Sequence, residues 1–190
     1  FIANVLNNRK ITDAIHALLD RGGLILGICN GFQALVKSGL LPYGRLGCVG
    51  KESPTLFRND INRHVSQIVT TRVATVNSPW LSSFEVGELH SIAVSHGEGK
   101  FVVSDEMAEE LFRNGQVAFQ YVDPDGNATL RAPYNPNGSS FGIEGIISRD
   151  GHILGKMGHT ERYEDGLFKN IAGNKVQEIF ANAVNYFKGK

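Results

Sequence analysis

Apolar residues recur along the chain with the spacing of helices that alternate with short buried strands. In residues 11–19 they stand three and four positions apart, which predicts an amphipathic helix that ends at Gly22 and Gly23. Residues 24–28, LILGI, form an unbroken apolar run that is typical of a strand buried in the centre of a parallel sheet. A second helix is expected directly afterwards, in residues 31–39.

The rest of the chain predicts further strands and a closing helix. Residues 64–76, 88–95 and 116–122 have a β-rich pattern, which indicates an extension of the sheet. Residues 141–148 and 152–158 flank the turn RDG and predict a hairpin. One face of a final helix, expected to cover the sheet, would carry five apolar residues: Val176, Ile179, Phe180, Val184 and Phe187.

These elements predict an α/β fold, with a mostly parallel sheet flanked by helices and a β-rich extension. The chain has 190 residues, 42% of them apolar, and neither an internal repeat nor an interdomain linker is evident. We therefore expect residues 1–190 to form a single domain. The chain opens at Phe1 without a methionine and enters a helical pattern almost at once, which indicates that the start of a longer protein is missing.

Charge and composition narrow the partners and the compartment. Nineteen basic residues balance nineteen acidic ones, so we expect no nucleic-acid partner and no membrane surface, and rather small, locally bound partners. No apolar run is long enough to span a bilayer, and no secretory signal is evident. With only Cys29 and Cys48, a disulfide framework is excluded, and a reducing, cytoplasmic location is expected.

The stretch GICNG, residues 27–31, carries the chemistry that is easiest to interpret. A strand that turns abruptly into a helix strains the residue between them, and small neighbours, here Gly27 and Gly31, let the turn close. This pattern is the nucleophile elbow with Cys29 in place of serine. At a helix N-terminus the thiol pKa is expected to fall from about 8.5 towards neutrality. The backbone N–H of Asn30 would face the oxyanion of a tetrahedral intermediate.

A thiol nucleophile needs a base, and the segment MGHTER supplies a candidate. His159 follows a predicted strand, and in an extended segment Glu161 projects to the same side and can orient the imidazole. Simpler interpretations stay open: Cys29 as a buried structural thiol, and His159 with Glu161 as an exposed polar turn. Residues 58–64, RNDINRH, are interpreted as a solvated loop, and the histidines lack the spacing of a metal site.

Four segments, in this order, resemble one known family: GICNGFQAL, SHGEGKF, YNPNGSSFGIEGIIS and GKMGHTER. They are similar to the class I (triad) glutamine amidotransferases, and within them to the glutaminase domain of phosphoribosylformylglycinamidine synthase (FGAM synthase). The resemblance covers essentially the whole chain and implies a flavodoxin-like fold. It implies that the domain hydrolyses L-glutamine through a cysteine thioester and supplies ammonia to a synthetase domain, for an ATP-dependent step of purine biosynthesis.

The resemblance also implies roles for individual residues. Cys29 matches the nucleophile, His159 the general base and acid, and Glu161 the carboxylate that orients it. Gln33 matches a position that contacts glutamine. The backbone of the segment that contains His96, Gly97 and Glu98 would hold the α-amino and carboxylate groups of the substrate. Residues 135–139, NPNGS, are characteristic of the family but receive no chemical step, and their simplest role is a tight turn.

Two departures from the family pattern stand out. Thr160 lies between His159 and Glu161, where relatives commonly have proline, so the turn loses a rigid φ but keeps both functional side chains. The family's first strand and its GGFS-like loop, expected to donate a second oxyanion amide, have no counterpart here. Loss of such a donor costs about 10²- to 10³-fold in turnover, so residues 1–190 alone are expected to be a poor glutaminase.

No metal or cofactor is expected in this chain, and ATP and magnesium are expected in the synthetase domain outside it. Two other functions stay open from the sequence. One is a different hydrolase or amidotransferase with a cysteine elbow. The other is an interaction module that keeps the fold without catalysis.

Overall fold

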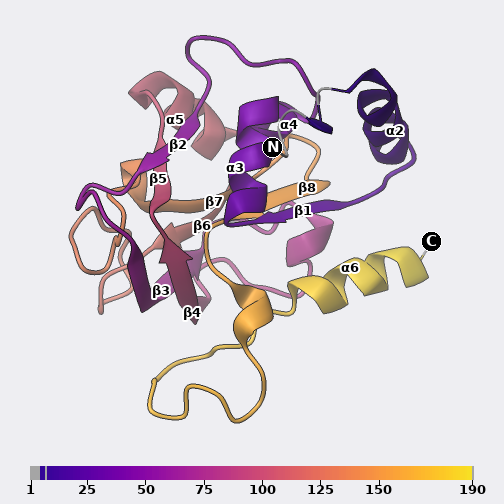
Figure 1. The fold of residues 1–190 in the computed structure, drawn as a ribbon. Helices are drawn as coiled ribbons and strands as arrows, with labels where there is room; N and C mark the ends of the chain where they lie inside the picture. The colour runs from indigo at the N-terminus through magenta and orange to yellow at the C-terminus, as the bar shows by residue number, and fades with distance from the viewer. Residues whose placement is uncertain (1–4, 7, 190) are drawn as a thin grey trace.

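The computed structural model describes residues 5, 6 and 8–189, and it places helices on both faces of a central sheet (Figure 1). The strands are β1 (Ile25–Ile28), β2 (Thr55–Arg58), β3 (Val65–Val73), β4 (Leu89–His96), β5 (Glu98–Val102), β6 (Val117–Tyr121), β7 (Ile143–Ile147) and β8 (Ile153–Lys156). The helices are α2 (Arg9–Asp20), α3 (Asn30–Ser38), α4 (Leu40–Tyr43), α5 (Asp105–Arg113) and α6 (Ile179–Lys188), with the 3₁₀ turns η1 (Pro79–Leu81), η2 (Ser140–Gly142) and η3 (Thr160–Arg162).

Six strands form the main sheet in the order β1-β8-β7-β6-β3-β4, and β2 pairs with β5 in a separate ribbon. The α/β class is confirmed, but the expectation of a mostly parallel sheet is wrong for the described strands. Only β1 and β8 run parallel, and the other pairs are antiparallel. The apolar run LILGI indicated a parallel strand and belongs to β1, which does pair in parallel with β8, but it does not determine the direction of the other strands. β6, β7 and β8 are buried on both faces in antiparallel pairs, so burial on both faces does not by itself indicate a parallel sheet.

Side chains that alternate along β8 explain the two packed faces. Ile153 belongs to the core under α3 and α4, whereas Leu154 belongs to the core with Trp80 and Leu81 of η1. The β7–β8 hairpin predicted from residues 141–158 is confirmed, as are the strands predicted near residues 65, 89 and 117. The parallel pairing brings the carboxyl ends of β1 and β8 together at one edge.

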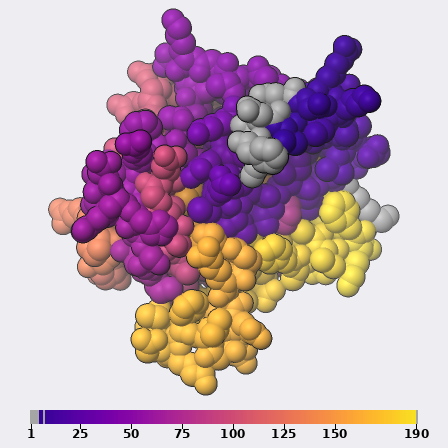
Figure 2. Space-filling model, viewed as in Figure 1, coloured from indigo at the N-terminus to yellow at the C-terminus, as the bar shows by residue number. Residues whose placement is uncertain are grey.

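The predicted final helix forms, but its buried face is not the one expected. Ile179 is fully buried, whereas Phe180, Val184 and Phe187 are each about half exposed (45%, 51% and 50%). The helix packs on η1 through a different line of residues, in which Asn182 donates a hydrogen bond to the Trp80 carbonyl at 3.0 Å. A long loop between η3 and α6 extends away from the sheet (Figures 1 and 2).

Among the described residues, no helix has both the length and the apolar character required to cross a membrane.

Candidate active site

Cys29 lies at the sharp turn between β1 and α3, as the elbow pattern predicts. Its backbone has φ 52° and ψ −105°, a conformation that a non-glycine residue adopts only at a cost of about 1–3 kcal/mol. Two backbone hydrogen bonds hold the turn: Cys29 N donates to Lys156 O at 2.8 Å, and Gln33 N donates to Cys29 O at 3.1 Å. The strained elbow is therefore built into the junction of sheet and helix.

The two glycines around Cys29 differ in how closely other atoms approach them. A Cβ on Gly27 would lie 2.7 Å from the Gly31 carbonyl carbon and 2.5 Å from a methyl carbon of Leu35. A Cβ on Gly31 would meet no described atom within 4 Å. The close approach of strand and helix thus requires a glycine at 27 alone, which corrects the expectation that both are needed to close the turn.

Burial raises the pKa of the Cys29 thiol, and this is the largest influence on it. The Asn30 N–H and the charge of Arg162 lower the pKa, while Glu161 raises it, and the balance is a pKa above the ordinary value. The expected fall towards neutrality is therefore wrong for the free chain, because the half-buried sulfur loses more hydration than the helix terminus repays. At neutral pH the resting group is a thiol, so it needs a base.

Alkylation rates should reveal this difference between the two cysteines. With iodoacetamide at pH 7, we expect Cys29 in a Cys48→Ser variant to react about tenfold more slowly than exposed Cys48 in a Cys29→Ser variant. The gap should narrow at alkaline pH, because the thiolate fraction of Cys29 continues to grow there. Mass spectrometry gives both rates, and an equal or faster Cys29 at pH 7 would contradict the raised pKa.

His159 and Glu161 form the contact that the sequence predicts. Nδ1 of His159 lies 2.5 Å from Glu161 Oε1, in a 3₁₀ turn rather than the extended segment we expected. The imidazole is buried, and its Nε2 has no hydrogen-bond partner among the described residues. One ring nitrogen is thus oriented by a carboxylate while the other is free to exchange a proton.

Strand β4 brings the histidine and the thiol to the same side. Ala93 O accepts a hydrogen bond from His159 N at 2.8 Å, and Ser95 O lies 3.8 Å from Cys29 Sγ. Carbonyls two residues apart on a strand point in the same direction, so both groups lie along one edge of β4. The structure therefore brings together Cys29, His159 and Glu161, which the sequence separates by 130 residues.

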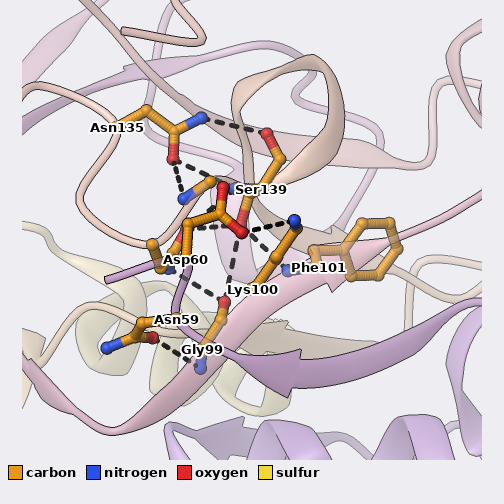
Figure 3. A network of polar contacts seen from close by, with 9 residues as sticks. Asn59, Asp60, Gly99, Lys100, Phe101, Asn135 and Ser139 are labelled. Carbon is orange, nitrogen blue, oxygen red and sulfur yellow. Dashed lines mark hydrogen bonds and ion pairs between the residues drawn. The ribbon is translucent and has the colours of Figure 1, made fainter. Parts of the chain in front are cut away.

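The segment 96–99 lies next to this edge and is fixed from two sides. The Gln33 side chain donates a hydrogen bond to Glu98 O, which ties α3 to the segment. Asn59 donates to His96 O at 2.8 Å and accepts from Gly99 N at 3.2 Å (Figure 3). Gly97 leaves open space beside its backbone, and the Glu98 side chain is exposed.

The NPNGS turn supports the other side of the same segment. Asn137 donates to Gly99 O at 2.9 Å, and Ser139 Oγ accepts from Phe101 N at 2.9 Å. Asn135 closes the turn by donating to Ser139 O at 2.9 Å, while Lys100 pairs with Asp60 at 2.5 Å (Figure 3). This motif, for which the sequence analysis predicts only a tight turn, is thus a buried bracket that holds β5.

The His96 side chain belongs to this bracket. Its ring is almost fully buried, with Nδ1 3.1 Å from Asn59 Oδ1 and Nε2 3.5 Å from Asn137 Nδ2. Burial, aided by the nearby charge of His64, lowers the pKa of His96 to about 4. The ring is therefore neutral at physiological pH, and Asn59 holds both the ring and the backbone carbonyl of His96.

His96 should make the protein sensitive to acid. Its folded pKa is about 4 and the unfolded value about 6.5, so its stabilisation is complete above pH 6.5 and is lost as the pH falls towards 4. Between pH 7 and 4.5 the loss in free energy of unfolding should be about 2–3 kcal/mol. Urea unfolding should show a shallower pH dependence for His96→Gln than for the wild type; parallel curves would contradict this assignment.

A cavity of about 230 Å³ adjoins the 96–99 segment. It is lined by Arg58, Asn62, Arg63, His64, Gly97 and Glu98. His64 Nε2 lies 3.0 Å from Ser95 Oγ, so a residue that lines the cavity contacts the residue whose carbonyl faces Cys29. Residues 60–64 are exposed and lie in a loop, as the sequence interpretation expected, and the cavity that this loop lines was not part of that expectation.

Among the described residues, no cluster of three or more His, Cys, Asp or Glu side chains could hold a metal ion.

Comparison with known proteins decides the family. Residues 1–187 match the model of the CobB/CobQ-like glutamine amidotransferase domain. The chain belongs to this family of glutamine amidotransferases. The match extends over the elbow, the 96–99 segment and the histidine turn, so the site described above lies wholly within the family domain.

Similarities to individual proteins are more specific than the family match. The chain is 37% identical over 168 residues to the phosphoribosylformylglycinamidine synthase subunit PurQ of Gloeobacter violaceus, covering 88% of this chain and 67% of the relative. The PurQ subunit of Chlorobaculum tepidum is 40% identical over 163 residues, which cover 85% of this chain and 64% of the relative. The structure of PurLQS from Thermotoga maritima matches with a TM-score of 0.68 and 28% identity, over 96% of this chain and 71% of the other.

Proposed function

We propose that the chain is the glutaminase part of an FGAM synthase, which hydrolyses L-glutamine and supplies ammonia for purine biosynthesis. One observation carries the catalytic half of this proposal. His159 is held at Nδ1 by Glu161 and has a free Nε2, and it lies along the same edge of β4 as the Cys29 thiol. The PurQ relatives carry the choice of synthase.

The geometry supports a two-stage reaction. His159 Nε2 takes the thiol proton, and the thiolate attacks the side-chain amide carbon of glutamine. The N–H of Asn30, which already faces the sulfur, then stabilises the oxyanion. The protonated imidazole donates to the leaving nitrogen, so ammonia departs and a γ-glutamyl thioester remains. His159 next activates water, which releases glutamate and restores the thiol.

The cavity beside residues 96–99 suits the other end of the substrate. Glutamine carries an α-carboxylate and an α-ammonium group, and the cavity is bordered by Arg58 and Arg63 as well as by Glu98. Its proximity to the elbow is supported by Ser95, whose side chain contacts His64 of the cavity and whose carbonyl faces the Cys29 sulfur. The backbone of Gly97 and Glu98 and the side chain of Gln33 complete this proposed glutamine pocket.

The ammonia acceptor belongs to a partner. In the proposal a synthetase subunit or domain, with its own ATP and magnesium, activates the formyl amide oxygen of phosphoribosylformylglycinamide, which ammonia replaces. The matched structure of PurLQS supports such an assembly. The free thiols of Cys29 and Cys48 suit a reducing cytoplasm.

A glutamine-mimicking electrophile tests the proposal directly. The full-length protein with its synthetase partner is treated with diazo-oxo-norleucine and analysed by mass spectrometry, with and without glutamine. One adduct on Cys29 that glutamine suppresses is expected, and Cys29→Ser should give none. An adduct that glutamine does not suppress would favour a different cysteine hydrolase, and a folded complex without any adduct would overturn the catalytic assignment.

A further inference from the structure

A buried lysine lies directly behind the turn that carries His159. Lys156 is the last residue of β8 and has no solvent exposure. Its Nζ donates to three oxygens: Gly158 O at 3.1 Å, Thr160 Oγ1 at 3.0 Å and Gln177 Oε1 at 2.8 Å. An ammonium has three protons, so each proton has an acceptor, which is the condition for a charged group to be tolerated in a core.

Two of these acceptors flank His159 on either side. Lys156 therefore holds residue 158 by its carbonyl and residue 160 by its side chain. A carboxylate beside Lys156 also holds this turn, because Gly158 N donates to Glu144 Oε1. Glu144 is itself fully buried, and its Oε1 lies 3.9 Å from Lys156 Nζ. The turn is thus held by two buried groups of opposite charge, the Lys156 ammonium and the Glu144 carboxylate.

The residue types in the turn fit this arrangement. A Cβ on Gly158 would lie 2.8 Å from Glu144 Oε1 and 3.2 Å from Lys156 Nζ, so a side chain there would displace both charges. Thr160 accepts from Lys156 and donates to Gln177 Oε1 at 2.6 Å. Gln177 ends the long loop that leaves η3 and returns to α6 (Figure 1), so the loop is anchored at the same point.

We propose that Lys156 is a positioning residue for His159, and that its hydrogen bonds to Gly158 and Thr160 direct the free Nε2 towards the Cys29 thiol. A proline at position 160 would fix φ through its ring and could not make the threonine's hydrogen bonds. In this chain the hydroxyl of Thr160 and the ammonium of Lys156 take over that restraint. The expected effect of Lys156 on turnover rests on the proposed function. The expected effect of Lys156 on the orientation of the His159 imidazole does not.

The sharpest test compares two substitutions at Thr160 in the full-length protein. Thr160→Val keeps the shape and removes the hydroxyl, whereas Thr160→Ser keeps the hydroxyl. In Thr160→Val the His159 ring signals in the NMR spectrum, assigned by their loss in His159→Gln, should shift, and kcat for glutamine hydrolysis should fall about tenfold with KM within about twofold. Thr160→Ser should retain the wild-type signals and rate.

Lys156→Met supplies the second arm, with exposed Lys169→Met as its control. We expect Lys156→Met to lower kcat about 100-fold, yet to cause no further loss when His159 is already glutamine, because both changes act through one group. Unchanged His159 signals in Thr160→Val, or a Lys156→Met effect that is the same in both backgrounds, would overturn the positioning role. A wild-type protein without glutaminase activity would instead refute the proposed function, and the NMR comparison would still decide this one.

Discussion

Replacing Cys29 by alanine is expected to lower glutamine hydrolysis by about 10⁴-fold or more while leaving the fold intact. The thiol is the atom that would form the thioester, and removal of a covalent nucleophile leaves only the stabilisation from binding and the oxyanion site. The residue is half-buried and packs against the core under α3, but alanine keeps its Cβ and removes only the sulfur, so little packing is lost. Glutamate release by the full-length protein with its synthetase partner measures the loss.

Two comparisons separate catalysis from stability. Cys48→Ala removes the other thiol, which is exposed, and should keep the wild-type rate and melting temperature. The Cys29→Ala complex should still make product when ammonia is supplied, because the synthetase reaction then bypasses the thioester. Residual hydrolysis above one hundredth of wild type, in a preparation free of other glutaminases, would exclude Cys29 as the nucleophile.

The features that the sequence predicts well are local ones. The elbow follows from Gly27 and Cys29 at a strand end, and the contact of His159 with Glu161 follows from their spacing of two residues. The family resemblance rested on such short segments and is confirmed by the match over residues 1–187. Local spacing brings these groups within reach of each other, although the 3₁₀ turn that joins His159 to Glu161 was not predicted.

Contacts between segments far apart in the chain could not be predicted from the sequence. The bracket around residues 96–101 joins Asn59, Gly99 and Asn137, which are separated by about 40 residues at each step. Lys156 looks like an exposed residue of a strand end, because lysine is rarely buried, and only the fold shows its partners at 144 and 177.

The error about the Cys29 pKa has the same origin. The sequence shows that a helix begins at residue 30, but not how much water the surrounding strands remove from the sulfur. Direction of strand pairing is likewise a property of the whole sheet. The thiol pKa and the direction of strand pairing both depend on which residues surround a position in the fold. A sequence pattern shows only that the position is buried.

Gly27→Ala and Gly31→Ala should have opposite effects on stability, although both glycines belong to the same short motif. The new methyl group at 27 would lie 2.7 Å from a backbone carbon of α3, well inside the usual contact of about 3.5–4.0 Å. Overpacking against backbone should cost about 3 kcal/mol and lower the melting temperature by roughly 6–12 °C. At position 31, inside the first turn of α3, alanine meets open space and should stabilise by about 0.5–1 kcal/mol through its higher helix propensity.

The activity of the same pair tests whether the elbow positions the thiol. The clash at 27 can be relieved only if β1 and the first turn of α3 move apart, and Cys29 lies between them. A displacement near 1 Å at a reacting atom costs about 10²-fold in rate, so Gly27→Ala should lose that much turnover even at temperatures where it remains folded. Thermal unfolding and glutamate release, measured on the full-length proteins at 15 °C, give both quantities. Equal melting temperatures for the two variants would show that strand and helix can separate freely, and the close packing at Gly27 would then not be what fixes the strained conformation of Cys29.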